Sequence, residues 1–421
     1  MKKKVILKAP VLTQSGYGHH SRTVLRSLRT RQDIFDIYLQ PLSWGATSWT
    51  WDDNEERRWI DELIRKTVEY TAQNGTYDMS IQVTIPNEWE KIAPVNIGVT
   101  AGIETTKIAP LWIQKSYEMD RILTISEFAK KSLVETVYEA TNNQTGEKVD
   151  FKINTPVEYI NYPVKTYKPD NIDLDLSTSF NFVAVAQVGP RKNLNQLIQC
   201  FVDKFRDNEN VGLILKTNSS KNSILDRHNT LISLKNFINS LGEKKCKIYL
   251  LHGFLTDAQM ASLYTNPKVK ALVSTTHGEG FGLPIFEAAY YGLPVVATDW
   301  SGHLDFLYMK QKQKNGKTKK KHMFSRISYV LQNVPQSAVW ENVIVPDSMW
   351  AYPEEGSIKQ NLEEVYKDHG RFKKRAKQLQ KWILEEFNEA KISKQYVDEI
   401  LGFDSADYQT ENTEQEVLEF E

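Results

Sequence analysis

The feature that most constrains this fold is a glycine-rich loop that separates two short apolar runs late in the chain. The first run covers residues 269–274, and the loop after it reads Thr-His-Gly-Glu-Gly-Phe-Gly-Leu-Pro from residue 276. Pro284 stands where a helix is expected to begin, a position at which proline sacrifices no hydrogen bond. A second apolar run starts at Pro294. The pattern predicts a strand–loop–helix–strand unit.

The start of the expected helix is suited to an anion. Its first N–H groups have no partner within the helix, and the helix dipole is positive at this end, so a phosphate is favoured there. Glu279 lies in the loop and Glu287 one turn into the helix, so both carboxylates can flank a ligand that docks at this point.

Length, composition and charge describe an ordinary globular protein. The 421 residues predict about two domains, and 40% hydrophobic with 25% charged residues is typical of globular chains. Lys+Arg and Asp+Glu both number 53, so no overall field attracts polyanions.

The same sequence predicts a cytoplasmic protein. Two cysteines, Cys200 and Cys246, cannot form a disulfide framework. The apolar run after the N-terminal lysines is too short for a signal peptide. No uninterrupted apolar run approaches the length of a membrane span.

Short apolar runs alternate with helical segments twice along the chain. In the first half, strands are expected at residues 5–9, 34–39, 79–83, 95–99 and 121–125, with helices at 54–73 and after Ser126, a plausible N-cap. In the second half, strands are expected at 182–186, 212–217, 247–252, 269–274 and 294–298, with helices at 193–205 and 222–241. This alternation favours two doubly wound α/β halves.

The spacing Glu279-x7-Glu287 around Gly-Phe-Gly-Leu-Pro resembles the signature of retaining GT-B glycosyltransferases of family four, the group 1 glycosyl transferases. An ordinary strand–loop–helix–strand unit of another doubly wound protein is the alternative. The resemblance implies two Rossmann-like domains that face each other across a cleft, with a C-terminal helix that crosses back to the first domain.

The resemblance also suggests domain boundaries. We expect an acceptor domain at residues 1–165, a polar linker at 166–179 and a nucleotide-sugar donor domain at 180–385. Residues 386–403 would form the returning helix, and the acidic residues 404–421 are expected to be disordered.

Several residues match the donor site of the family. Lys192 matches a lysine that faces the donor diphosphate, whereas Gln187 stands where the family usually has an arginine. Arg191 remains undecided between a replacement for that arginine and a solvated residue. The expected donor-binding residues are Gly16, Lys192, Lys216, Gly280, Phe281, Gly282, Leu283, Pro284 and Glu287.

Two carboxylates are the expected catalytic residues. The resemblance implies that Glu279 holds sugar hydroxyls and stabilises the developing oxocarbenium charge. Many relatives have a histidine after a middle strand of the first domain, but residues 96–106 contain none. Glu104 is the expected substitute, in a role of orienting an acceptor hydroxyl or accepting its proton; an ordinary surface carboxylate is the alternative. His19 and His20 receive no catalytic role.

No metal ion and no cofactor beyond the nucleotide sugar are expected. The Asp-x-Asp pattern at Asp173 and Asp175 falls in the polar linker. In the GT-B family, helix dipoles and basic side chains replace the divalent ion.

The acceptor site is expected near the tryptophans after the second strand. Trp49 and Trp51, together with Trp44, lie in a loop and are candidates for stacking on a sugar ring; a hydrophobic plug is the alternative. The basic run from Lys310 to Arg326 is a candidate contact for nucleic acid or an anionic membrane, with a solvated loop as the alternative.

Three functions therefore remain open. The first is a retaining hexosyl- or pentosyltransferase that uses a nucleoside diphosphate sugar and a glycan or small-molecule acceptor. The second is a glycosyltransferase that acts on modified bases of DNA. The third is a catalytically inactive GT-B scaffold. The donor nucleotide, the sugar and the oligomeric state are not fixed by the sequence.

Overall fold

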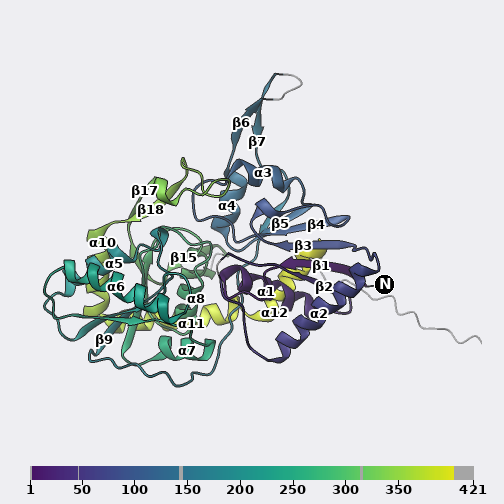
Figure 1. Cartoon of the computed structure of the whole chain (residues 1–421). Helices are drawn as coiled ribbons and strands as arrows, with labels where there is room; N and C mark the ends of the chain where they lie inside the picture. The colour runs from purple at the N-terminus through teal and green to yellow at the C-terminus, as the bar shows by residue number, and fades with distance from the viewer. Residues whose placement is uncertain (1, 46, 142–145, 313–315, 403–421) are drawn as a thin grey trace, which may run out of the picture.

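The computed structural model of this protein describes residues 2–45, 47–141, 146–312 and 316–402. Two parallel six-stranded sheets, each covered by helices, form two domains that lie side by side (Figure 1). The expected tail, residues 404–421, lies outside the described residues. None of the described helices combines the length and low polarity that a membrane crossing needs.

The first sheet has the strand order β2-β1-β3-β4-β5-β8. Its strands are β1 (Lys3–Ala9), β2 (Phe35–Pro41), β3 (Met79–Val83), β4 (Val95–Val99), β5 (Arg121–Thr124) and β8 (Val157–Tyr159). Its helices are α1 (Gly16–Arg29), α2 (Glu55–Ala72), α3 (Pro110–Ser116) and α4 (Glu127–Glu135). The predicted cap is present, because Ser126 accepts a hydrogen bond from the backbone N–H of Ala129 at 3.0 Å.

The second sheet has the strand order β11-β10-β9-β12-β13-β16. Its strands are β9 (Phe180–Val185), β10 (Val211–Lys216), β11 (Lys247–Leu251), β12 (Val269–Ser274), β13 (Val295–Thr298) and β16 (Ser325–Ile327). Its helices are α5 (Leu194–Phe205), α6 (Ile224–Ser240), α7 (Asp257–Thr265), α8 (Leu283–Tyr290), α9 (Leu304–Leu307), α10 (Glu355–Lys367) and α11 (His369–Glu386). The chain changes direction across the sheet between β9 and β12, where ligands of such sheets bind beyond the strand ends.

The last helix, α12 (Glu389–Leu401), belongs to the first domain although it follows the second. Ile392, Tyr396, Val397 and Ile400 are all buried in the core built by β1 and α1. The Tyr396 hydroxyl lies 3.0 Å from Nε2 of His20 on α1. The predicted returning helix is therefore confirmed (Figure 1).

Three antiparallel hairpins were not predicted. They are β6–β7 (Tyr138–Thr141 and Lys148–Phe151), β14–β15 (Tyr308–Lys312 and Thr318–His322) and β17–β18 (Tyr329–Asn333 and Met349–Pro353). The first projects from the molecule in Figure 1. The second contains most of the basic run, of which Lys314 lies outside the described residues. A polar run with lysines on both faces has no apolar alternation, so its strands carry no pattern to detect.

Candidate active site

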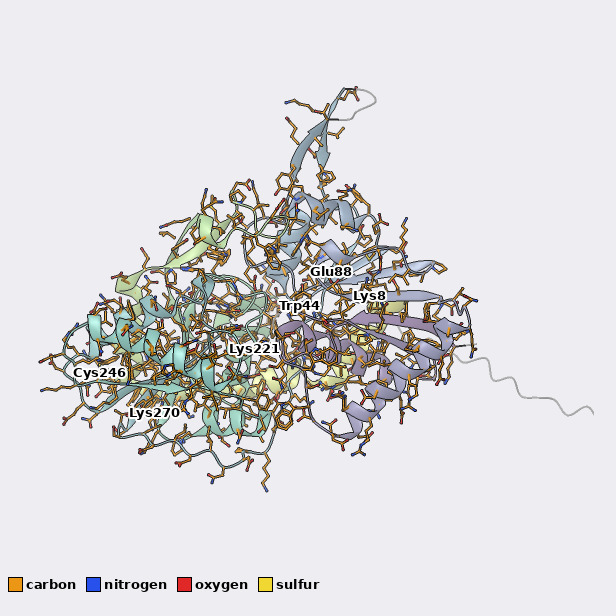
Figure 2. The ribbon with its side chains drawn as sticks, viewed as in Figure 1. Lys8, Trp44, Glu88, Lys221, Cys246 and Lys270 are labelled. Atoms are coloured by element: carbon orange, nitrogen blue, oxygen red, sulfur yellow. The ribbon has the colours of Figure 1, made fainter. Side chains whose placement is uncertain are left out.

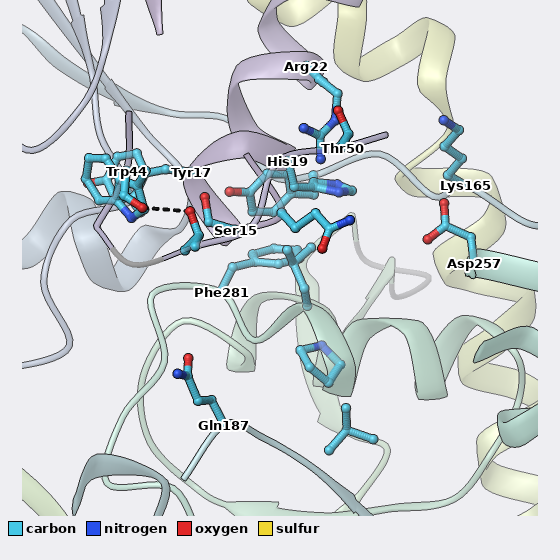
Figure 3. Close-up of a pocket in the computed structure, with 18 of the residues that line it drawn as sticks. Ser15, Tyr17, His19, Arg22, Trp44, Thr50, Lys165, Gln187, Asp257 and Phe281 are labelled. Carbon is cyan, nitrogen blue, oxygen red and sulfur yellow. Dashed lines mark hydrogen bonds between the residues drawn. The ribbon is translucent and has the colours of Figure 1, made fainter. Parts of the chain in front are cut away.

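A cleft of about 1110 Å³ lies between the two domains. Both domains line it, through the segments that follow β1 and β4 in the first sheet and β9 and β12 in the second. Figure 3 shows Tyr17, His19 and Arg22 on one side of this space and Gln187 on the other, with Phe281 between them. The loop predicted from residue 276 onward is therefore part of an interdomain site.

Glu279 is the acidic centre of the cleft. Its side chain is only 10% exposed, and its Oε1 accepts a hydrogen bond from Nζ of Lys192 at 2.6 Å. Nη1 of Arg191 lies 3.1 Å from its Oε2. Burial alone would raise the pKa of Glu279, but the charges of Lys192 and Arg191 outweigh it and lower this pKa to about 2. The carboxylate is therefore ionised at neutral pH.

Arg191 joins the two domains. Its Nη2 lies 3.1 Å from Oε1 of Glu104, which follows β4 in the first domain, while Nη1 contacts Glu279 of the second. The structure thus places Glu104 and Glu279, the two predicted catalytic carboxylates, within ion-pair distance of the Arg191 guanidinium.

The sequence does not decide the role of Arg191, and the local geometry of the residue explains why. Residues Pro190–Lys192 form a short 3₁₀ turn, in which successive side chains do not alternate between faces as they do in a strand. Arg191 and Lys192 therefore both reach the cleft. Gln187 also lines the cleft, but its amide donates to the backbone carbonyl of Ser219 at 3.1 Å.

The loop that carries Glu279 is held from both domains. The backbone N–H of Glu279 donates to Ser301 Oγ, and its carbonyl accepts from the N–H of Gly302, both at 2.9 Å. From the first domain, the Ser126 hydroxyl donates to the carbonyl of Gly280 at 2.6 Å. A Cβ at Gly302 would lie 1.8 Å from that same carbonyl oxygen, so only glycine allows this close approach.

Helix α8 begins at the cleft as predicted. Gly282 precedes it with a φ of 88°, Pro284 stands in the first turn, and no side chain caps the helix. Gly280, Phe281, Gly282, Leu283 and Pro284 all line the cleft. Phe281 is also buried against Phe286 and Phe306, which anchors the loop.

Glu287 lies one turn farther along α8 and does not line the cleft wall. Its Oε2 accepts a hydrogen bond from the hydroxyl of Tyr264 at 2.9 Å. Burial raises the pKa of Glu287 to about 7, and this hydrogen bond only partly opposes the shift. Glu279 in the cleft is thus firmly ionised, whereas Glu287, outside the cleft lining, titrates near neutral pH.

The remaining predicted donor residues lie on opposite walls. Gly16, the first residue of α1, is exposed on the cleft wall with open space where a Cβ would stand. Lys216, at the end of β10, also lines the cleft and donates from Nζ to the carbonyl of Gly253 at 2.6 Å.

The three loop tryptophans take different positions. Trp44 lines the cleft and its ring centroid lies 4.1 Å from that of Tyr17; Figure 2 shows it near the junction of the domains. Trp49 and Trp51, the predicted acceptor residues, are 50% and 71% exposed and do not line the cleft. Trp51 contacts Phe254 of the second domain, with centroids 5.9 Å apart, and Phe254 does line the cleft.

The side chains of His19 and His20 lie in different environments. His19 lines the cleft, where burial and the nearby charges of Arg22 and Arg26 lower its pKa to about 3, so the ring is neutral. His20 is fully buried against α12. The sequence assigned neither a role, and nothing but the fold distinguishes these adjacent residues.

The basic run lies away from the cleft. Lys310 and Lys320 line a separate hollow of about 330 Å³ against the C-terminal helices. Nζ of Lys320 lies 3.1 Å from a carboxylate oxygen of Glu127 in the first domain. Among the residues that the structure describes, no lysine of this run lines the cleft that contains Glu279.

Comparison with known proteins points to one family. Residues 174–336 match the model of the family "Glycosyl transferases group 1". Over these residues the chain is similar to the group 1 glycosyl transferases. The matched segment contains Lys192, Arg191, Glu279 and Glu287, which are the second-domain residues described above.

Curated relatives are distant and longer. A serotype-specific mannosyltransferase, WbdA of Escherichia coli, is 26% identical over 198 residues, which is 45% of this chain and 23% of that protein. The chain therefore spans about a quarter of the length of the curated relatives it matches.

Solved structures establish the GT-B fold. The structure of Alr3699/HepE of Anabaena, described as a complex with UDP and glucose, has a TM-score of 0.61 at 14% identity and covers 95% of this chain and 100% of its own. Sucrose-phosphate synthase of Thermosynechococcus elongatus has a TM-score of 0.58 at 11% identity, with 94% and 98% covered. At such identities the likeness concerns the fold alone.

Proposed function

We propose that this protein moves a hexosyl or pentosyl group from a nucleoside diphosphate sugar to a hydroxyl of a glycan or small-molecule acceptor, with retention of the anomeric configuration. The observation that carries the proposal is the convergence of Glu279, Lys192 and Arg191 beside the uncapped start of α8. An anion-binding helix end next to two cations fits a diphosphate.

The proposed reaction breaks the bond between the anomeric carbon and the terminal phosphate oxygen of the donor. The acceptor oxygen forms its bond to the same face of that carbon, and its proton passes to the departing phosphate. Lys192, Arg191 and the α8 end stabilise the negative charge that grows on the diphosphate. These fixed charges take the place of a divalent metal ion in the proposal.

The carboxylates have separate proposed roles. Glu279, fixed by Lys192 and Arg191, holds hydroxyls of the transferred sugar and stabilises positive charge at the anomeric carbon. Glu104 faces the cleft from the first domain and orients the acceptor hydroxyl. Glu287 binds the ribose hydroxyls once the nucleotide has displaced its contact with Tyr264.

A donor-hydrolysis screen tests the proposal. The protein is incubated with UDP-, GDP- and ADP-sugars, and release of the nucleoside diphosphate is measured. We expect release from at least one donor, which also names the nucleotide. Binding of a nucleotide sugar without release from any donor would instead support the inactive GT-B scaffold.

The DNA-directed alternative has its own test. Strand β15 of the basic hairpin is largely exposed, and no described residue of the hairpin lines the cleft. This separation favours a glycan or small-molecule acceptor. Neutralising Lys319, Lys320 and Lys321 together with glutamine should leave turnover on such an acceptor unchanged. If the wild-type protein binds duplex DNA in a salt-sensitive manner and the triple variant does not, the result would support a transferase that acts on DNA.

A further inference from the structure

The cleft contains a second group of cations, away from Glu279. Arg22 and Arg26 of α1 line the cleft together with Lys165, which follows β8. In Figure 3, Arg22 and Lys165 lie on the far side of Phe281 from Gln187. This cationic group belongs to the first domain, whereas Lys192, Arg191 and Lys216 belong to the second domain.

The three cations differ in how their charges are compensated. Arg26 is matched by Glu56, with two guanidinium nitrogens bonded to the two carboxylate oxygens. Within the described ranges, neither Arg22 nor Lys165 forms an ion pair with a carboxylate. Arg22 is fixed instead by two backbone carbonyls, those of Val11 at 2.7 Å and Thr13 at 3.1 Å. These bonds orient its guanidinium without neutralising it.

Lys165 is held by an aromatic ring. Its Nζ lies 5.4 Å from the ring centroid of Tyr167, a contact that leaves the ammonium hydrogens free for an anion. Burial and the charge of Arg26 lower the pKa of Lys165, which shows that its charge lacks full compensation. Glu56, Asp257 and Glu389 oppose this shift, Glu56 most strongly, but among the described residues none of them forms an ion pair with Lys165.

We infer that the acceptor carries an anionic group, a phosphate or a carboxylate, which binds to Arg22 and Lys165. This inference rests on the proposed function and names the substrate class of the same cleft. An acceptor with hydroxyls alone would leave two half-buried cations unpaired, which is unfavourable. An anionic group would gain charge-assisted hydrogen bonds from both. The donor diphosphate does not need them, because the second domain has its own cations.

The test compares matched acceptors. Wild-type protein, with the donor found by the hydrolysis screen, is given glucose, glucose 6-phosphate and glucuronate, and the corresponding sets of mannose and galactose. We expect kcat/KM for an anionic member to exceed that of its neutral counterpart by roughly tenfold or more. Comparison of the sugar phosphates with the sugar acids shows whether the site prefers a phosphate or a carboxylate.

Three variants assign the preference to this site. Lys165→Gln should lower the ratio of anionic to neutral kcat/KM about tenfold, mainly through KM, and Lys165→Arg should restore most of it. Lys168→Gln, an exposed lysine on the same segment, should leave the ratio unchanged. In parallel, the unfolding temperature of the protein is measured with the nucleoside diphosphate and each probe bound. This measurement detects a probe that binds to the cleft without reacting.

The outcomes separate the two proposals. Donor release without any preference for anionic probes, in turnover or in binding, overturns this inference and leaves the proposed function intact. An equal loss for neutral and anionic probes in Lys165→Gln also overturns it. Absence of donor release from every nucleotide sugar overturns the proposed function itself.

Discussion

Glu279 shows how neighbouring charges can override burial at a single residue. Its carboxylate is almost completely buried, yet Lys192 and Arg191 keep it ionised. In return, the carboxylate holds both cations at the position that we propose for the donor diphosphate. The chemistry proposed for the cleft depends on this group of three side chains.

Replacing Glu279 with glutamine should lower turnover by about 100-fold or more, since one preorganised charge contact is typically worth that much in the transition state. Glutamine keeps the shape of the side chain, so the protein should remain folded by circular dichroism. Release of the nucleoside diphosphate is the measurement, with the exposed Glu341→Gln as control. Near-normal turnover in Glu279→Gln would refute the role assigned to this residue.

Glu287 should make donor binding depend on pH. Its pKa of about 7 means that it becomes ionised as the pH rises through neutrality, and an ionised carboxylate can accept hydrogen bonds from two ribose hydroxyls. We expect the affinity for the nucleoside diphosphate, measured by calorimetry, to increase over this range. Glu287→Gln should bind more weakly and with a flat profile; a slope that persists in this variant would contradict the assignment.

Ionisation of Glu287, which should strengthen donor binding, is expected to lower the free energy of unfolding. Because the pKa of Glu287 is raised in the folded state, the folded protein holds more protons than the unfolded chain between pH 4.5 and about 7. Its contribution to the free energy of unfolding is therefore full below pH 4.5 and decreases as the pH rises through this window. The affinity for the nucleoside diphosphate is therefore expected to rise over the same pH range in which Glu287 ceases to contribute to the free energy of unfolding.

At the scale of elements, the site depends on how closely two loops approach each other. The loop after β12 carries Glu279, and the loop after β13 supports it through Ser301 and Gly302. Ser126, the cap of α4, holds the first of these loops from the other domain. A helix cap thereby also acts as an interdomain contact, which its local sequence does not reveal.

Gly302→Ala should disturb this arrangement. The new Cβ would lie 1.8 Å from the carbonyl oxygen of Gly280, so the loop must shift, at a cost of about 1–3 kcal/mol in stability. Turnover should fall as Glu279 moves. Thermal unfolding and donor hydrolysis measure the two effects.

Gly356→Ala is a matched control for that substitution. Gly356 lies near the start of α10 with nothing within 4 Å of its Cβ position, so alanine should be neutral or slightly stabilising there. If Gly302→Ala and Gly356→Ala have the same unfolding temperature and the same rate of donor hydrolysis, the close approach at Gly302 is unimportant.

At the scale of the whole molecule, the cleft is defined by contacts between the domains. Arg191 and Glu104 meet across it, and Asp305 of α9 accepts hydrogen bonds from the backbone of Glu127 and from Asn161, both at 2.9 Å. Helix α12 completes the core of the first domain after the chain has built the second.

Ending the chain after Phe387 should therefore unfold the first domain. The truncation removes four side chains of α12 that are buried in the hydrophobic core. Each is worth about 1.5–3 kcal/mol, and together they approach the ~5–15 kcal/mol that stabilises a typical domain. Soluble yield and thermal unfolding are the measurements.

A chain that ends at Gly402 serves as the control for that truncation, because it keeps every contact that the structure describes. We expect it to unfold like the full-length protein. An unchanged unfolding profile in the chain that ends at Phe387 would show that α12 is not part of the first core.

The amino-acid sequence alone was enough to predict the alternation of strands and helices, the doubly wound class of both halves and the spacing of Glu279 and Glu287. These features depend on neighbours along the chain, where the periods of strands and helices are directly visible. Even so, strand ends shifted by one or two residues, and the short strands β8 and β16 and the three hairpins were not predicted.

Which side chains share the cleft depends on how the two domains fold and pack together. The tertiary structure paired Arg191 with Glu104, placed Trp44 rather than Trp49 or Trp51 on the cleft wall, and gathered Arg22 with Lys165. The partners in these contacts are far apart in the sequence, and each comes into place through the packing of a different loop or helix. Local periodicity contains no information about such contacts, because their geometry exists only once both sheets have folded and docked.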